Sequence, residues 1–98
     1  MANVLVLLDG QALTGKAMHK TYKVATDFGN VTVPADKISF IHFERGNPSG
    51  LDEVVLRSTT ALRGEVSPDP IKFKLDDTGE TLEVPQKKAH TLIMFKEL

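Results

Sequence analysis

The three histidines are the side chains in this sequence best suited to transfer protons near neutral pH or to bind a metal ion. His19, His42 and His90 are far apart in the sequence and form none of the close pairs that metal sites usually show. The chain has no cysteine, which excludes disulfides, cysteine–zinc sites, thiol catalysis and iron–sulfur clusters. We therefore predict no metal site and no cofactor, and assign the histidines to the surface or the core.

A second group of chemistry-bearing residues is acidic and lies in "LDDTGE" (75–80). Asp76, Asp77 and Glu80 could supply oxygen ligands to calcium, but the acidic spacing of an EF-hand loop is absent. Aspartate and glycine are also what a tight turn requires. We predict a hairpin turn at this position.

The remaining candidates for catalysis are weaker. "GQALTGK" (10–16) ends in Gly-Lys but lacks the spacing of a phosphate-binding loop and leads into no helix. No serine lies in a G-x-S-x-G motif. Three glutamates, Glu53, Glu65 and Glu83, could line a cleft. Which of these carboxylates would lie close together cannot be deduced without the strand register. The sequence predicts that the chain is not an enzyme. An enzyme with a site in a cleft between two halves of the chain is the third of three functional hypotheses.

Composition and charge set the class of protein. The 98 residues are 41% hydrophobic and 26% charged, which is typical of one globular domain. A net charge of -1 gives neither half the basic excess of a protein that binds the phosphate backbone. The apolar run in "MANVLVLLDG" is too short to span a bilayer and no basic region precedes it. We expect a cytoplasmic protein that does not bind membranes.

The elements that would position any site occur twice. "FGNVTVPADKISFIHF" (28–43) resembles "GETLEVPQKKAHTLIMF" (79–95) at an offset of 51, whereas "ALTGKAM" (12–18) matches "ALRGEVS" (61–67) at an offset of 49. The difference of two residues falls at the proline-rich "SPDP" (67–70), where a loop accepts length changes. We interpret the pattern as a duplication with a first repeat at 1–45, a linker at 46–51 and a second repeat at 52–98.

Each repeat reads as an all-β unit of four or five short strands, because apolar and polar residues alternate and turn residues separate the runs. Short 3₁₀ turns are expected at "PADK" (34–37) and "PQKK" (85–88). Gly15 and Gly64 lie at matching positions inside strands, where glycine marks a bulge or a sharp bend, so valine at either should destabilise the protein. The predicted strands cover residues 3–8, 12–18, 21–26, 30–34, 38–44, 52–57, 61–66, 71–76, 80–84 and 90–96.

The last strand of each repeat is apolar on both faces. Ile41 and Phe43 would occupy one face and Ile38 and Phe40 the other, so both faces should be covered. We expect the two repeats to cover each other, either as separate barrels or as one barrel or sandwich with shared strands. Structural residues are therefore predicted at the bend, before each turn and in the last strands: Gly15, Gly64, Pro34, Pro85, Ile41, Phe43, Leu92 and Met94.

The order of a strand, a bent strand with a central glycine, a third strand, "G-x-V-x-V-P", a short turn and "I-x-x-I" resembles small SH3-like and Sm-like barrels. The resemblance covers most of each repeat and implies a tandem pair of such units, as a pseudo-two-fold barrel pair or sandwich. The RNA-contacting Asp-x-Asn triplet of the Sm family has no match, since "HKTYK" and "PDPIKF" occupy that place. The second repeat also looks similar to small bacterial β domains, a resemblance that implies no activity.

Two further hypotheses follow for function. The first is a non-enzymatic interaction or assembly module that binds a protein partner or itself, most simply as a homodimer, because small sheets with unpaired edges can add strands. The alternative is a small barrel that binds single-stranded nucleic acid through lysines and stacking aromatic rings. Its contact residues would be Lys16, Lys20, Tyr22, Lys23, Lys72, Phe73 and Lys74.

Overall fold

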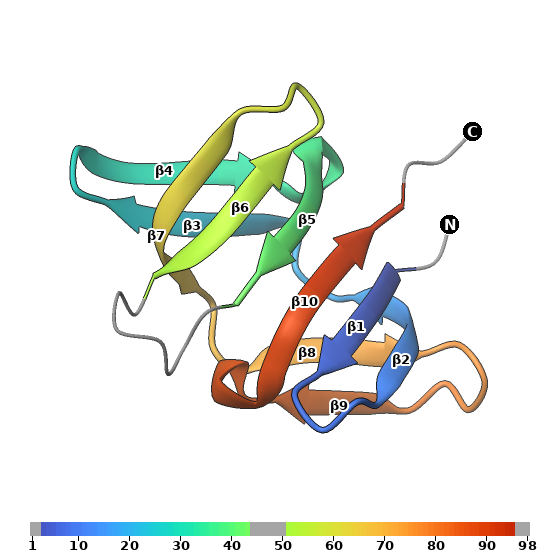
Figure 1. Cartoon of the computed structure of the whole chain (residues 1–98). Coiled ribbons are helices and arrows are strands. Elements are labelled where there is room, and N and C mark those ends of the chain that lie inside the picture. The colour runs from blue at the N-terminus through green and yellow to red at the C-terminus, as the bar shows by residue number, and fades with distance from the viewer. Residues whose placement is uncertain (1–2, 44–50, 96–98) are drawn as a thin grey trace.

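The computed structural model describes residues 3–43 and 51–95, and the predicted all-β class is confirmed (Figure 1). No helix in these two segments is long and apolar enough to cross a membrane. The linker prediction falls almost wholly at 44–50, outside the described residues. The elements are β1 (Asn3–Leu7), β2 (Ala12–Ala17), β3 (Thr21–Thr26), β4 (Gly29–Pro34), η1 (Ala35–Lys37), β5 (Ile38–His42), β6 (Asp52–Leu56), β7 (Ala61–Ser67), β8 (Ile71–Leu75), β9 (Thr81–Val84), η2 (Gln86–Lys88) and β10 (Ala89–Met94).

The strands form where apolar and polar residues alternate in the sequence. In β3, Tyr22 and Val24 are buried while the residues between them are exposed, and Ile71 and Phe73 repeat the pattern in β8. The two expected 3₁₀ turns are both present, and each begins directly after a proline with extended backbone, Pro34 or Pro85. The prolines thus separate β4 from β5 and β9 from β10.

All ten strands belong to one curled antiparallel sheet in the order β4-β3-β7-β6-β5-β10-β1-β2-β8-β9. Five strand pairings join the first described segment to the second: β1–β10, β2–β8, β3–β7, β5–β6 and β5–β10. The sequence leaves open whether the two segments share strands, and the structure shows that they do. Within a segment the strands pair only as hairpins, β1–β2 and β3–β4 in the first and β6–β7 and β8–β9 in the second. Neither segment therefore forms a continuous sheet by itself.

Gly15 and Gly64 lie where a strand passes from one neighbour to the next. Gly15 is opposite Asn3 of β1 and also opposite Leu75 of β8. Gly64 ends the pairing of β7 with β6, and β7 pairs with β3 from the following residue. A Cβ on either glycine would overlap a backbone carbonyl oxygen. No register shift falls at either position, so these glycines permit close backbone approach and are not bulges.

The core is one cluster of buried side chains at the inner face of the sheet. Ile41, Phe43, Leu92 and Met94 all belong to it, with at most 5% of each residue exposed. The prediction that Ile38 and Ile41 lie on opposite faces of the strand is wrong. A register shift between Ile38 and Phe40 makes Ser39 a bulge, which returns Ile38 to the core side.

The second face of the last strands also differs from the expectation of mutual cover. β10 does not lie on top of β5 but beside it in the same sheet, with Ile93 opposite Phe40. Phe40, His42 and Ile93 remain half-buried on this face. β5 and β10 instead lie at the centre of the sheet, each paired on both edges, and the side chains on their second face are only partly covered.

Candidate functional site

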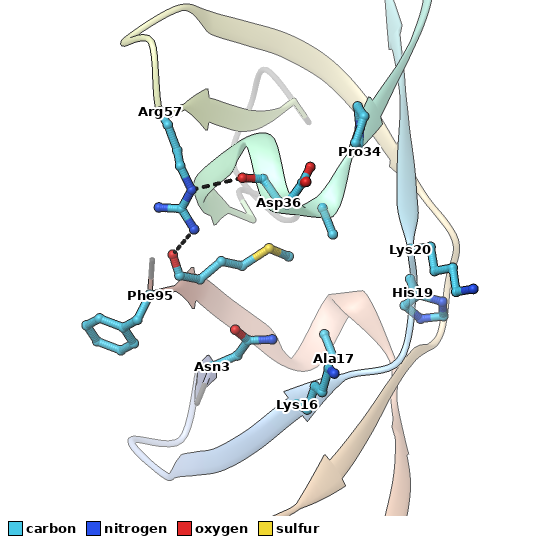
Figure 2. A pocket seen from close by; sticks show the side chains of 11 residues that line it. Asn3, Lys16, Ala17, His19, Lys20, Pro34, Asp36, Arg57 and Phe95 are labelled. Atoms are coloured by element: carbon cyan, nitrogen blue, oxygen red, sulfur yellow. Dashed lines mark hydrogen bonds between the residues drawn. The ribbon is translucent and has the colours of Figure 1, made fainter. Parts of the chain in front are cut away.

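A cleft of about 630 Å³ lies between η1 on one side and the start of β1 and end of β2 on the other (Figure 2). It is formed by segments far apart in the sequence, and the end of β10 closes it. We call this space the cleft. Its lining residues are Asn3, Lys16, Ala17, His19, Lys20, Pro34, Ala35, Asp36, Arg57, Met94 and Phe95.

Arg57 links η1 to the end of β10 at the cleft. Its Nε donates a hydrogen bond to the Asp36 carbonyl oxygen at 3.0 Å, and its Nη2 donates to the Met94 carbonyl oxygen at 2.9 Å (Figure 2). The backbone N–H of Arg57 also donates to the Lys37 carbonyl oxygen at 2.9 Å. Sequence reasoning missed this residue because nothing near it in the chain signals contacts with η1 and β10.

His19 lies in the loop between β2 and β3, as expected. Its Nε2 accepts a hydrogen bond from the Lys72 backbone N–H at 3.0 Å, so the proton of the neutral ring is on Nδ1. Partial burial lowers the pKa of His19, and the nearby positive charge of Lys72 lowers it further. The ring thus enters the cleft as a neutral group at neutral pH.

The predicted nucleic-acid contacts are only partly brought together. Lys16 lies directly opposite Lys74, while Lys72 lies opposite Glu83. Lys20 lines the cleft, and Lys23 is exposed in β3. The aromatic part of the prediction is wrong: Tyr22 and Phe73 are 1% and 0% exposed. Both rings fill the core, so neither is available to stack on a base.

The hydroxyl of Tyr22 is buried and has no hydrogen-bond partner among the described residues. Burial raises its pKa, because the phenolate would lose its hydration. At the offset of 51, the residue that matches Tyr22 is Phe73. Because an unpaired buried hydroxyl costs about 1 to 3 kcal/mol, we expect Tyr22→Phe to leave stability unchanged or raise it by about 1 kcal/mol.

Chemical denaturation of the wild type and Tyr22→Phe measures this effect. A loss of more than about 1 kcal/mol would show that the hydroxyl has a hydrogen-bond partner that matters. Phe73→Tyr is the reciprocal control, and it should destabilise because it introduces a buried hydroxyl into the same environment.

The other chemistry-bearing residues form no recognised catalytic group. His42 and His90, distant in the sequence, meet with ring centroids 4.9 Å apart, a contact that sequence reasoning missed. Asp76, Asp77 and Glu80 lie in the β8–β9 hairpin turn, where the Leu75 N–H donates to the Glu80 carbonyl oxygen. Across residues 3–43 and 51–95, no cluster of three or more His, Asp or Glu could hold a metal ion.

The sheet has two terminal strands, β4 and β9, which are each paired on one side only. β4 contains no charged residue, whereas β9 contains Glu83. At the tip of the β3–β4 hairpin Phe28 is fully exposed, and Val31 of β4 is 38% exposed. The Thr26 hydroxyl donates to the Gly29 carbonyl oxygen at 2.7 Å and accepts from the Phe28 N–H at 3.1 Å, which fixes the tip.

Comparison with protein-family models, curated proteins and solved structures found no significant match. The case for function therefore depends on the cleft and the edge strands.

Proposed function

We propose that the chain is a non-enzymatic assembly module that pairs with a second copy of itself through β4. The observation that carries the proposal is a six-residue terminal strand that has no charge and, among the described residues, no strand paired to its outer edge. An edge of this kind is a template for adding another strand, and proteins that avoid such pairing place charges or bulges there.

We also propose that the module arose from a tandem duplication of an SH3-like unit. When β1–β5 are matched with β6–β10, the strand order reads the same from either end of the sheet. Gly15 and Gly64 make equivalent close approaches, and the two register shifts, at Ser39 and His90, occupy matching positions. These agreements support a two-fold plan in which each unit gives two strands to the other half.

The outer edge of β4 has a definite set of free backbone groups. The Ala35 N–H donates to the Lys20 carbonyl oxygen at 2.8 Å, so Lys20 and Ala35 form a hydrogen-bonded pair. In antiparallel strands, hydrogen-bonded and non-hydrogen-bonded pairs alternate along the strands. Asn30 and Thr32 therefore direct their N–H and C=O groups away from β3. A symmetric antiparallel pair centred on Val31 would place Asn30 of one copy opposite Thr32 of the other, with four main-chain hydrogen bonds, and Phe28 opposite Pro34.

The opposite end of the sheet explains why β4 and not β9 is the pairing edge. In β9 the alternation of hydrogen-bonded pairs starts from Leu75–Glu80. It follows that Thr81 and Glu83 direct their N–H and C=O groups away from β8. Glu83 occupies the position that Thr32 has in β4. A carboxylate there would be desolvated by an added strand, so the edge resists pairing.

Sedimentation of the wild type and Thr32→Glu tests the proposal. At high concentration we expect the wild type to sediment with twice the 10.8 kDa mass of the chain. A high concentration is needed because the interface is small and the dimer should be weak. Thr32→Glu should raise the dissociation constant at least tenfold, about 1.4 kcal/mol, by placing a charge at the new hydrogen-bonded pair. Thr81→Glu makes the same change on β9 and should leave the dimer intact. A wild type that stays monomeric at millimolar concentration would contradict the proposal.

A further inference from the structure

The cleft has a strongly unequal charge distribution. Three permanent cations line it, Lys16, Lys20 and Arg57, against one carboxylate, Asp36. Within the described ranges neither lysine ammonium group makes an ion pair with another residue. Clefts lined by one sign of charge concentrate ligands of the opposite sign, so the lining favours an anion.

Arg57 is preorganised for such a ligand. The two carbonyl oxygens that it contacts, one on η1 and one on β10, hold Nε and Nη2 in place. Its remaining nitrogen, Nη1, has no hydrogen-bond partner in residues 3–43 and 51–95, and the guanidinium places a positive charge at the cleft. Because the side chain is already ordered, binding would lose little additional side-chain entropy.

Besides Asn3 and His19, the rest of the lining is apolar. Ala17, Ala35 and Met94 line the cleft, together with Phe95, which is 51% exposed. A thioether beside two methyl groups and an exposed aromatic ring can pack an aliphatic or aromatic body. A volume of about 630 Å³ is within the roughly 300–1,000 Å³ range of small-molecule sites.

At the matching place in the second half of the chain the space beside residue 86 is filled, whereas the counterparts of Arg57 and Asp36, Leu8 and Lys87, line a separate pocket of about 590 Å³. There Gln86 corresponds to Ala35, and its side chain is fully buried. Its Nε2 donates to the carbonyl oxygens of Val66 at 2.8 Å and Pro68 at 2.9 Å. The charges differ as well, since Glu65 replaces Lys16 and Leu8 replaces Arg57. Alanine at position 35 thus leaves open the space that glutamine occupies in the other half.

We propose that the cleft binds a small organic anion, with its carboxylate or phosphate toward Arg57 and Lys16 and its apolar body against Met94 and Ala35. Of the residues placed in the proposed β4 pair, only Pro34 also lines the cleft. The lining of the cleft carries the inference, because it combines an open volume with three cationic side chains against one carboxylate, and because Ala35 leaves open the space that Gln86 fills in the other half.

Amide chemical-shift titrations of the full chain with hexanoate, hexanol and inorganic phosphate test the site. We expect saturable shifts at Ala17, Ala35 and Phe95 with hexanoate, and at least tenfold weaker binding of hexanol, which lacks the charge, and of phosphate, which lacks the apolar body. Raising the salt concentration should weaken hexanoate binding, because ions screen the cations. Equal shifts with hexanol and hexanoate, or none with either, would overturn the proposal.

Two variants copy residues from the second half and locate the site. Ala35→Gln fills the space and Lys16→Glu reverses a charge, and each should weaken hexanoate binding at least tenfold while the spectrum remains dispersed. Lys87→Ala, outside the cleft, should bind as the wild type does. Unchanged hexanoate binding by folded Ala35→Gln would contradict the site. Both variants should still form the β4 dimer, so failure of one proposal leaves the other measurable.

Discussion

Replacing Gly15 or Gly64 by alanine is expected to cause the largest loss of stability of any single-methyl change in the chain. The new Cβ of Gly15→Ala would overlap the Lys74 carbonyl oxygen, and that of Gly64→Ala would overlap the Ala25 carbonyl oxygen. These are backbone atoms held in strand pairings, so neither can rotate away as a side chain would. We expect a loss of about 3 kcal/mol or more for each variant, at the upper end for overpacking.

Thermal unfolding measures the effect, which should lower the midpoint by roughly 10–20 °C in a domain of this size. Gly79→Asn is the matched control. Its φ of 74° suits asparagine, and nothing lies within 4 Å of an added Cβ. This variant should change stability by less than about 1 kcal/mol. Midpoints for both alanine variants that equal the wild type would show that the strands do not approach as closely as described.

Separating the chain in the linker should abolish folding of each part as a monomer. A fragment of residues 1–47 or 48–98 loses all five pairings that join the two described segments, including both partners of β5. A short chain with so few remaining pairings cannot bury enough apolar surface to offset its conformational entropy. Each fragment alone should give a narrow amide spectrum, and an equimolar mixture should recover the dispersed spectrum of the intact chain.

The outcome distinguishes shared strands from separate barrels. A fragment that folds only as a homodimer agrees with the two-fold plan, because a second copy can supply the missing strands. A fragment that gives a dispersed spectrum at monomer mass would contradict the exchange of strands between the halves.

Local structure could be predicted from the sequence to a large extent. Alternation in "YKVAT" and "IKFKL" located β3 and β8, and the prolines before "ADK" and "QKK" located both 3₁₀ turns. These features depend on neighbouring residues alone. The burial of Ile41 and Leu92 also followed from local pattern, whereas the bulge at Ser39 did not, because only the partner strand reveals an extra residue.

The sites could not be predicted, because they depend on which distant strands pair. The contact of Arg57 with Met94 and that of His42 with His90 follow from the β5–β10 pairing, for which the sequence carries no local signal. Tyr22 and Phe73 were misassigned as stacking surfaces because alternation shows which residues share a face, not which face is inside. The open space beside Ala35 became recognisable only once Gln86 was found filling its counterpart.

Amide hydrogen exchange along the two terminal strands, measured over a range of protein concentration, tests the assembly proposal most directly. If β4 pairs with a second copy, the outward amides of Asn30 and Thr32 become protected as concentration rises, while those of Thr81 and Glu83 on β9 exchange rapidly throughout. Rapid exchange of Asn30 and Thr32 at every concentration would contradict pairing through β4.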